Sequence, residues 1–268
     1  PSPVYVSSWN NNSAQSSFTF SFDTDGFTVP STSGMTNASG SSYVAYCWKA
    51  NEGTTSSNTD GTITSTVQAN TGAGFSIVTY TGDGANGTVG HGLGATPEIV
   101  IVKRLNSTGN WSISGNVGGL SYGTNKLMFN STNGLTNDTN EVTSAGSSTF
   151  TAGTSGSVGA SGSSYVAYCF RSITGYSKIA SYSGTGSSNS ITGLGFQPQY
   201  VMIKCTTSVE DWAIFDASRG ANLFLTANTT SADSSFSGFS FDTDGFTVPG
   251  TSGMTNGSGQ TYLYMAFK

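Results

Sequence analysis

The residues of this chain best suited to chemistry gather in residues 209–219, with the sequence VEDWAIFDASR. Acidic side chains flank a tryptophan there, and two carboxyl groups about 5–10 Å apart are the groups that cleave glycosidic bonds. An aromatic ring beside acids can also hold a sugar without cleaving it. If the chain contacts a glycan, we expect the contacts at Trp212, Asp216 and Arg219. The related stretch around Trp111, GNWSISGN, contains no acids, so the alternative is a strand with a structural tryptophan.

Other groups that could react are few. His91 is the only histidine, and a Ser-His-Asp triad would need it as the base. No G-x-S-x-G elbow accompanies it, which favours a loop residue. Asp-x-Asp-Gly occurs at residues 23–26 and 242–245. Alternating oxygen ligands are typical of calcium loops, but the further acids of such loops are missing, which favours a hairpin turn. We therefore expect no catalytic residue, no metal site and no cofactor, in a protein that is not an enzyme.

The three cysteines, Cys47, Cys169 and Cys205, are too few and odd in number for a disulfide framework. Cys47 and Cys169 occupy the same place in two copies of the sequence YVAYC. A residue in equivalent places of two units more readily fills two cores than pairs with its own copy. We expect buried free thiols, because free cysteine behaves as a small apolar residue.

An internal repeat organises the chain, and three of its segments share one ending. SYVAYCWK at residues 42–49 matches SYVAYCFR at 164–171 and TYLYMAFK at 261–268. The eleven letters FSFDTDGFTVP stand ahead of the first and third endings, at residues 20–30 and 239–249.

Two segments also share one beginning. Leu93, Pro97, Lys103 and Trp111 each have a counterpart 101 residues later, in Leu194, Pro198, Lys204 and Trp212. The sequence therefore predicts two full units, at residues 75–174 and 175–268. Residues 1–50 are the back half of a third unit, and residues 51–74, rich in Ser, Thr, Asn and Gly, form a linker.

The residues that repeat have the character of short strands. Phe22 and Phe27 flank an Asp-Gly pair, as in a tight hairpin. The stretch IVIVK at 99–103 is continuously apolar, as in a strand buried on both faces. Thr, Val and aromatic residues favour strands, and Gly, Asn, Ser and Asp favour turns. We predict an all-β protein of tandem β-sandwich-like units of about 100 residues, two full and one partial.

Charge excludes several classes of partner. Only 9% of the residues are charged and the net charge is −5. Since nucleic-acid binding relies on Lys and Arg that neutralise phosphates, it is not expected here. No apolar run approaches the ~20 residues of a membrane helix, so membrane insertion is not expected either.

Taken together, these motifs resemble an uncharacterised repeat module of virion and tail-fibre proteins of marine bacteriophages. The resemblance is carried by GFSIVTYTGDGANGTVGHGLGATPEIVIVKR, SGSSYVAYCF, GYSKIASYSGTGS, DWAIFDASR and TYLYMAF, and runs from about residue 17 to 268. It implies a structural, adhesive and non-catalytic protein of a phage particle, such as a tail fibre, a spike or a capsid-surface appendage used in host attachment. The family has no established catalytic residues to carry over.

The implied partners are other copies of the chain, as a homo-oligomer such as a trimer, and other virion proteins. The implied location is the virion, on its extracellular surface. Two alternatives stay open: a carbohydrate-binding module that recognises host surface polysaccharide, and a cellular surface or filament protein.

Overall fold

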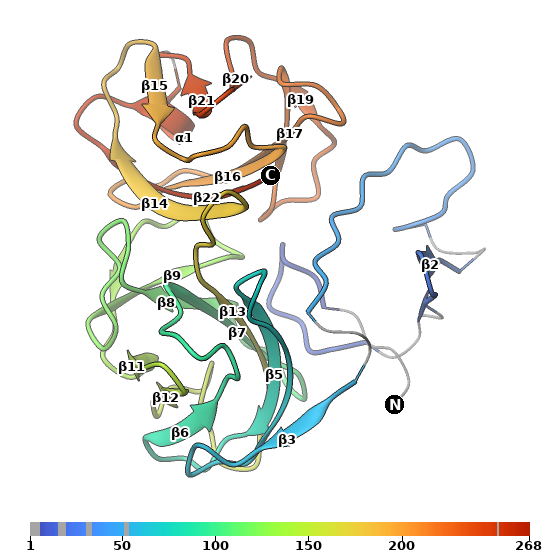
Figure 1. Ribbon diagram of the computed structural model, residues 1–268, viewed down its shortest axis with the longest axis vertical. Coiled ribbons are helices and arrows are strands. Elements are labelled where there is room, and N and C mark those ends of the chain that lie inside the picture. Colours follow the sequence, from blue (N-terminus) through green and yellow to red (C-terminus); the bar gives the residue numbers. More distant parts are fainter. Residues whose placement is uncertain (1–5, 16–19, 31–33, 51–53, 251) are drawn as a thin grey trace.

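The computed structural model describes residues 6–15, 20–30, 34–50, 54–250 and 252–268. These residues form short antiparallel strands, with one helix of four residues, α1 (Gly253–Asn256). The predicted all-β class is therefore confirmed. Three parts of the chain surround a common centre in Figure 1: the N-terminal residues on the right, residues 54–174 below and residues 175–268 above.

The largest sheet has eight strands in the order β10-β9-β8-β7-β13-β5-β4-β3. Its strands are β3 (Ser56–Asn58), β4 (Ser65–Asn70), β5 (Phe75–Thr81), β7 (Ile99–Arg104), β8 (Ser112–Gly115), β9 (Asn125–Met128), β10 (Thr136–Asn137) and β13 (Ser164–Phe170). Two of them, β3 and β4, come from the stretch whose composition predicts a linker, and they extend the sheet beyond β5.

A three-stranded sheet, β11-β12-β6, faces the large one. It is built from β6 (Gly87–Gly90), β11 (Val142–Ala145) and β12 (Thr149–Ala152). Val78, Val100 and Tyr165 of the large sheet pack with Val89 and Phe150 of the small sheet in one buried cluster. The burial of these side chains from both sheets is what holds the two layers together.

The C-terminal part has a six-stranded sheet in the order β14-β22-β16-β17-β18-β19. Its strands are β14 (Ser177–Ser183), β16 (Tyr200–Cys205), β17 (Trp212–Asp216), β18 (Leu223–Thr226), β19 (Ser234–Ser235) and β22 (Thr261–Phe267). A second three-stranded sheet, β15-β21-β20, faces it and consists of β15 (Asn189–Thr192), β20 (Ser240–Asp242) and β21 (Gly245–Val248). Val201, Phe215 and Tyr264 pack with Phe246 and Val248 in the cluster between these layers.

The two large sheets follow one plan. The order β10-β9-β8-β7-β13-β5 in one sheet and β19-β18-β17-β16-β22-β14 in the other places counterpart strands side by side. The middle strands are buried on both faces, as the apolar run IVIVK predicts. Ile99 and Ile101 of β7 point away from the facing small sheet, whereas Val100 and Val102 point toward it.

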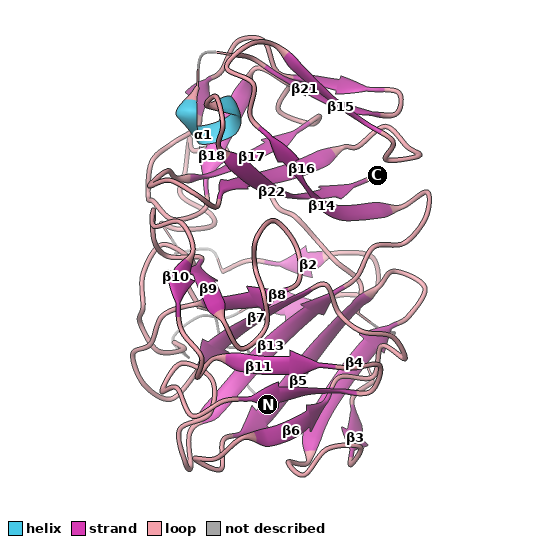
Figure 2. Ribbon diagram, turned by 90° about the vertical axis from the view of Figure 1, so that its left-hand side faces the viewer, coloured by secondary structure: helices cyan, strands magenta, loops and turns pink. Residues whose placement is uncertain are grey.

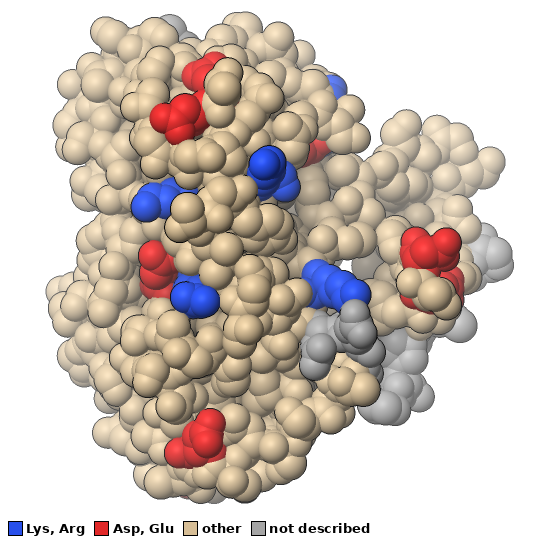
Figure 3. Space-filling model, in the orientation of Figure 1, with Lys and Arg blue, Asp and Glu red and all other residues tan. Residues whose placement is uncertain are grey.

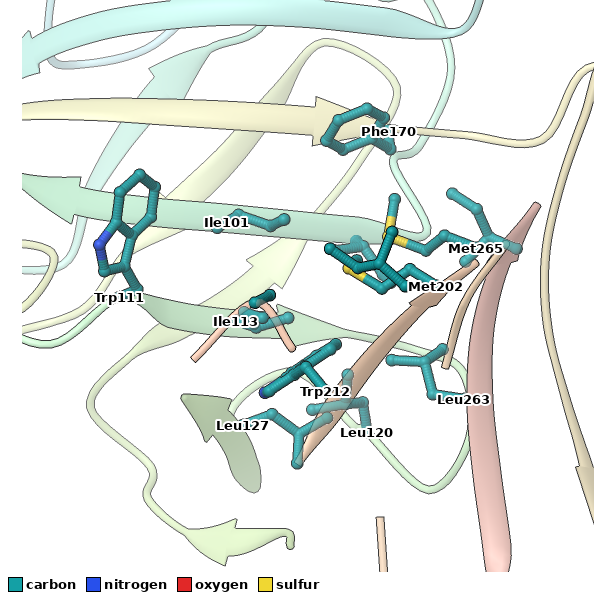
Figure 4. Packing of buried hydrophobic residues seen from close by; sticks show 14 of the residues in the cluster. Ile101, Trp111, Ile113, Leu120, Leu127, Phe170, Met202, Trp212, Leu263 and Met265 are labelled. Carbon is teal, nitrogen blue, oxygen red and sulfur yellow. The ribbon is translucent and has the colours of Figure 1, made fainter. Parts of the chain in front are cut away.

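The outward faces of the two large sheets share a third buried cluster. Figure 2 shows the two sheets one above the other, and Figure 4 shows the side chains that fill the space between them. Ile101, Ile113 and Leu127 come from one sheet and Met202 and Leu263 from the other. We call this set of residues the central cluster.

The described residues of the N-terminal segment (6–15, 20–30 and 34–50) contribute to the central cluster and contain no large sheet. Their described strands are β1 (Ser21–Phe22) and β2 (Phe27–Thr28), which form a two-stranded sheet. Residues 43–48, which match β13 and β22 in sequence, run extended, but no strand of the described chain pairs with them. Val6, Tyr46 and Trp48 pack against the central cluster.

None of the described residues belongs to a helix with the length and apolar character needed to cross a membrane.

Candidate functional site

Trp212, the aromatic residue of the predicted glycan contact, lies inside the protein. Its side chain is 1% exposed and belongs to the central cluster. Its indole Nε1–H donates to the carbonyl of Met128 at 3.1 Å, and its ring meets Phe129 edge to face at 5.1 Å. A ring without an exposed face cannot stack on a sugar, so in this conformation Trp212 is a structural residue, the alternative that the sequence left open.

Asp216 and Arg219, the polar residues of that prediction, bind each other and Tyr46. Arg219 Nε lies 2.6 Å from Asp216 Oδ2, and the Tyr46 hydroxyl donates to the same oxygen at 2.7 Å. Burial alone would raise the pKa of the Asp216 carboxyl, but the Arg219 amide, the Tyr46 hydroxyl and the guanidinium together hold it below its usual value. The pair therefore anchors the N-terminal segment to the end of β17.

A buried lysine stands beside Trp212. Lys204 is fully buried at the end of β16, and its Nζ donates to the carbonyls of Thr132 at 2.8 Å and Glu210 at 2.5 Å. The Glu210 amide donates to the same Thr132 carbonyl at 2.8 Å. With the bond from Trp212 to Met128, these contacts fasten the C-terminal part to the loop that follows β9.

The same contacts occur a second time, one repeat earlier. Lys103 is fully buried, and its Nζ donates to the carbonyls of Gly109 at 2.7 Å and Asn11 at 3.2 Å. The Gly109 amide donates to Asn11 at 2.8 Å, and Trp111 Nε1 donates to the carbonyl of Ser7 at 2.8 Å. These bonds fasten residues 54–174 to the N-terminal segment.

We call each such set of bonds, from one buried Lys and one buried Trp to the carbonyls of the preceding repeat, a Lys–Trp seam. The tryptophans donate to Ser7 in one seam and Met128 in the other, and the lysines donate to Asn11 and Thr132. Within each of these two pairs of acceptors the residues are 121 positions apart in the sequence. One further bond also repeats at this spacing, since the Ala14 amide donates to Leu105 at 2.9 Å and the Leu135 amide to Thr206 at 2.7 Å. The N-terminal segment therefore meets the next repeat in the same register as that repeat meets the last one.

Burial changes the chemistry of both lysines. Loss of water around the ammonium lowers the pKa of Lys103 to about 8 and that of Lys204 to about 8. Each Nζ is committed to two carbonyl oxygens in a buried site. We therefore assign both lysines to the joining of repeats.

Corresponding aromatic residues of all three segments meet at the central cluster. Trp48, Phe170 and Phe267 occupy the same place in the three endings. The ring centroids of Trp48 and Phe267 are 5.5 Å apart, and those of Phe170 and Phe267 are 6.2 Å apart. Val6, Leu127 and Leu225 each precede the residue that corresponds to the Trp acceptor of a seam, and all three pack in this cluster.

The remaining candidates have structural partners. His91 is fully buried, and its ring bonds the Gly146 carbonyl at 3.1 Å and the Leu93 amide at 3.2 Å; burial lowers its pKa. Asp242 accepts the hydroxyls of Ser240 and Thr247 at 2.8 Å and 2.7 Å within its hairpin. No group of His, Cys, Asp and Glu suited to a metal ion occurs among the described residues.

The prediction that the cysteines are buried free thiols holds for two of the three. Cys169 and Cys205 are buried and free. Cys47 is also free but is exposed, so the prediction is wrong there. The physical reason is that the Cys169 side chain packs in the cluster between the large sheet and the small sheet that faces it, whereas residues 43–48 belong to no sheet of the described chain.

The fold and the seams define a class: an all-β protein whose related segments are joined by repeated buried contacts. Residues 5–268 match the model of a family described as "Domain of unknown function (DUF7483)", so the chain belongs to that family. A search of the curated proteins found no match. A search of the solved structures found none either.

The seam lysines were missed as functional residues in the sequence. Lys103 and Lys204 were noted there as landmarks of the repeat, since a lysine ends the apolar strand in both units. A lysine at the same place after a strand buried on both faces was the available signal, because such a lysine must find acceptors inside the protein.

Proposed function

We propose that the protein is a structural, non-catalytic component of a bacteriophage particle, such as a tail fibre, a spike or a capsid-surface appendage. The observation that best supports a structural role is the Lys–Trp seam, which is built twice with corresponding partners. The polar side chains that could serve catalysis, Asp216, Arg219 and the two seam lysines, are engaged in holding segments together. The phage assignment follows the resemblance of the motifs.

The building block of this proposal is a β-sandwich-like unit at residues 75–174 and again at 175–268. The shared strand order supports it, as does the buried cluster between a large and a small sheet in each stretch. Residues 1–50 are the back half of a third unit, and residues 51–74 connect it to the next one.

The proposed partners are further copies of the chain, as a homo-oligomer such as a trimer, and other virion proteins, on the outer surface of the particle. Charge is sparse and scattered on the face shown in Figure 3, with no large patch of one sign. Such a surface suits protein contacts that depend little on salt, and it offers no basic footprint for nucleic acid.

The experiment is the mass of the native assembly by light scattering, with negative-stain images of the same sample. A trimer or a longer rod is the expected result. A compact globular monomer would contradict a fibre and favour a surface decoration protein. Gold-labelled antibodies on phage particles and on host cells would separate a virion protein from a cellular surface or filament protein.

Glycan recognition at Trp212, Asp216 and Arg219 is the weaker alternative. It requires a Trp212→Ala variant that folds normally and has lost binding to host surface polysaccharide. Because Trp212 is buried, we expect that variant to lose stability instead, by about 3–5 kcal/mol. Circular dichroism and a polysaccharide pull-down on the same sample distinguish the two results.

A further inference from the structure

The third copy of the central strand lacks both of its neighbours. In the complete sheets, β13 pairs with β5 on one side and β7 on the other, and β22 pairs with β14 and β16. Residues 43–48 have the same sequence pattern. Their side chains alternate between exposed and half-buried as in a strand, and the half-buried Tyr46 and Trp48 pack against the central cluster. Yet within the described residues no strand lies on either side of them. Their backbone groups therefore have no strand partner among the described residues, and unpaired edges of this kind can take up a further strand.

The hairpin of the same segment lacks a partner too. In the C-terminal copy, β21 pairs with β20 and also with β15. In the N-terminal copy, β2 pairs with β1 and with no other strand of the described chain. Five of the six large apolar side chains exposed among the described residues belong to residues 6–50; they are Trp9, Phe22, Phe27, Met35 and Tyr43.

The acceptors of a third Lys–Trp seam are present in the C-terminal part, but no Lys and Trp donors face them among the described residues. Thr226 and Thr230 correspond to Met128 and Thr132, the carbonyl acceptors of the seam between the two complete sheets. No lysine or tryptophan side chain of the described residues donates to the carbonyls of Thr226 and Thr230. Around this gap the N-terminal segment already touches the C-terminal part, where Ser8 Oγ donates to the Ala227 carbonyl at 2.6 Å.

These unmade contacts share one origin, because all their counterparts lie in the first half of a unit. Strands β5 and β7 flank β13, β6 flanks β12, and Lys103 and Trp111 form a seam. All of them fall within residues 75–115. The three parts of the chain in Figure 1 all contribute side chains to the central cluster, and the N-terminal part has counterparts of the second half of a unit.

We propose that the open surface formed by residues 43–48, β2 and the carbonyls of Thr226 and Thr230 binds a polypeptide segment of the sequence type of residues 75–115. This segment adds one strand on each side of residues 43–48 and one beside β2. Its Lys and Trp, eight residues apart as in the two existing seams, donate to Thr230 and Thr226. The inference goes beyond the proposed function and does not depend on the particle to which the protein belongs.

The chemistry of the surface selects this occupant over others. A sugar could not pair two strand edges at once, because strand pairing needs alternating amide and carbonyl groups at peptide spacing. A second copy of the chain is disfavoured, since its residues 75–115 are already paired inside its own sheets.

Cys47 provides the test. Its counterpart Cys169 is buried between paired strands, whereas Cys47 is exposed. Ser7 corresponds to Met128 in the repeat, so residue 1 corresponds to residue 122. A segment that ends at residue 121 can therefore be joined directly to residue 1. The chain is extended before Pro1 by a second copy of residues 75–121, which contains no cysteine. Labelling of Cys47 by a thiol reagent is compared in the extended and the original chain, with Cys169 and Cys205 as internal controls.

The expected result is a fall of at least about a hundredfold in the labelling rate of Cys47 in the extended chain, with no change in its oligomeric state relative to the original chain. A matched extension carrying alanine in place of its Lys and Trp should protect Cys47 less, because it cannot make the seam. If the extended chain does not fold, residues 75–121 are coexpressed as a separate polypeptide. Cys47 that stays reactive in both arrangements overturns the proposal. A dimeric original chain with an unreactive Cys47 also overturns it and assigns the surface to a second copy.

Discussion

The sequence FSFDTDGFTVP occurs twice in this protein, and its two copies have the same local structure in opposite surroundings. Phe22 faces Phe27 in one hairpin, and Phe241 faces Phe246 in the other. In each hairpin the first aspartate, Asp23 or Asp242, accepts two hydroxyl hydrogen bonds, one from Ser and one from Thr. Yet Phe27 is 39% exposed and Phe246 is completely buried.

A tyrosine after each hairpin shows the same contrast between local hydrogen bonds and burial. The Tyr43 hydroxyl accepts the Ala38 amide at 2.8 Å and donates to the Gly34 carbonyl at 3.2 Å. Tyr262 bonds the residues five and nine places before it in the same way, both at 2.6 Å. Tyr262 is fully buried, but Tyr43 is 47% exposed. Contacts within a few residues therefore fix the local conformation, whereas burial depends on neighbouring strands that the C-terminal copy has and the N-terminal copy lacks among the described residues.

The largest expected effect comes from the same truncation in the two hairpins. Phe246→Ala removes a buried ring from the cluster between β21 and the large sheet, and should destabilise the protein by about 3–5 kcal/mol. Phe27→Ala removes a ring that already contacts solvent, and should cost less than about 1 kcal/mol. Urea unfolding of both variants measures the difference. Equal losses would mean that the N-terminal hairpin is buried in solution.

A second pair of substitutions tests the close approach of strands. A Cβ on Gly245 would lie 1.9 Å from the Ile191 carbonyl oxygen of β15, whereas a Cβ on Gly26 would meet no atom within 4 Å. Gly245→Ala must push β21 and β15 apart, which should cost about 2–3 kcal/mol. Gly26→Ala should change the unfolding free energy by less than about 0.5 kcal/mol. Thermal unfolding of the two variants checks this, and a Gly26→Ala variant as unstable as Gly245→Ala would contradict it.

The seam lysines extend the comparison to pH. The pKa of Lys204 is about 8 in the folded chain, against 10.5 for a free side chain. Between these values the unfolded chain binds more protons, so the lysine's contribution to folding stability rises with pH. The unfolding free energy of the native chain minus that of Lys204→Met should therefore grow by about 1 kcal/mol per pH unit from pH 8 to 9.5, in urea titrations. The tyrosine and cysteine ionisations cancel in this difference.

Lys103→Met is the matched variant, because Lys103 has the same pKa but binds Asn11 of the N-terminal segment. Its loss should mainly increase hydrogen exchange in residues 6–15, with a smaller effect on global unfolding. A stability difference between the native chain and Lys204→Met that does not change with pH would contradict the assignment of Lys204, and unchanged exchange in residues 6–15 of Lys103→Met would contradict that of Lys103.

Several features of the fold could be predicted from the sequence because they depend on local patterns. The hairpin around Asp23 and Gly26, the strand Ile99–Arg104 buried on both faces and the repeat spacing of 101 residues follow from turn residues and apolar runs. The strands of residues 54–70 could not be predicted, because edge strands of Ser and Thr have the composition of a linker. The burial of Trp212 could not be predicted either, because a tryptophan with acidic neighbours in the sequence is compatible both with an exposed site and with a position between two sheets.

The contact between Tyr46 and Asp216, 170 residues apart, joins the N-terminal segment to the six-stranded sheet and should give the smallest effect. Tyr46→Phe removes one hydrogen bond to a carboxylate that Arg219 still holds, so the loss should be about 1 kcal/mol. Amide exchange in residues 43–50 should accelerate about fivefold. Tyr168→Phe is the control, since Tyr168 occupies the same place in the repeat and its hydroxyl makes no hydrogen bond among the described residues.

Because the pKa of Asp216 lies below its usual value, the native contact should weaken as the pH falls through that lowered pKa, and the exchange in Tyr46→Phe should change less with pH. Identical exchange in the native chain and in Tyr46→Phe at neutral pH would mean that the packing of the Tyr46 and Trp48 rings holds the segment in place without this hydrogen bond.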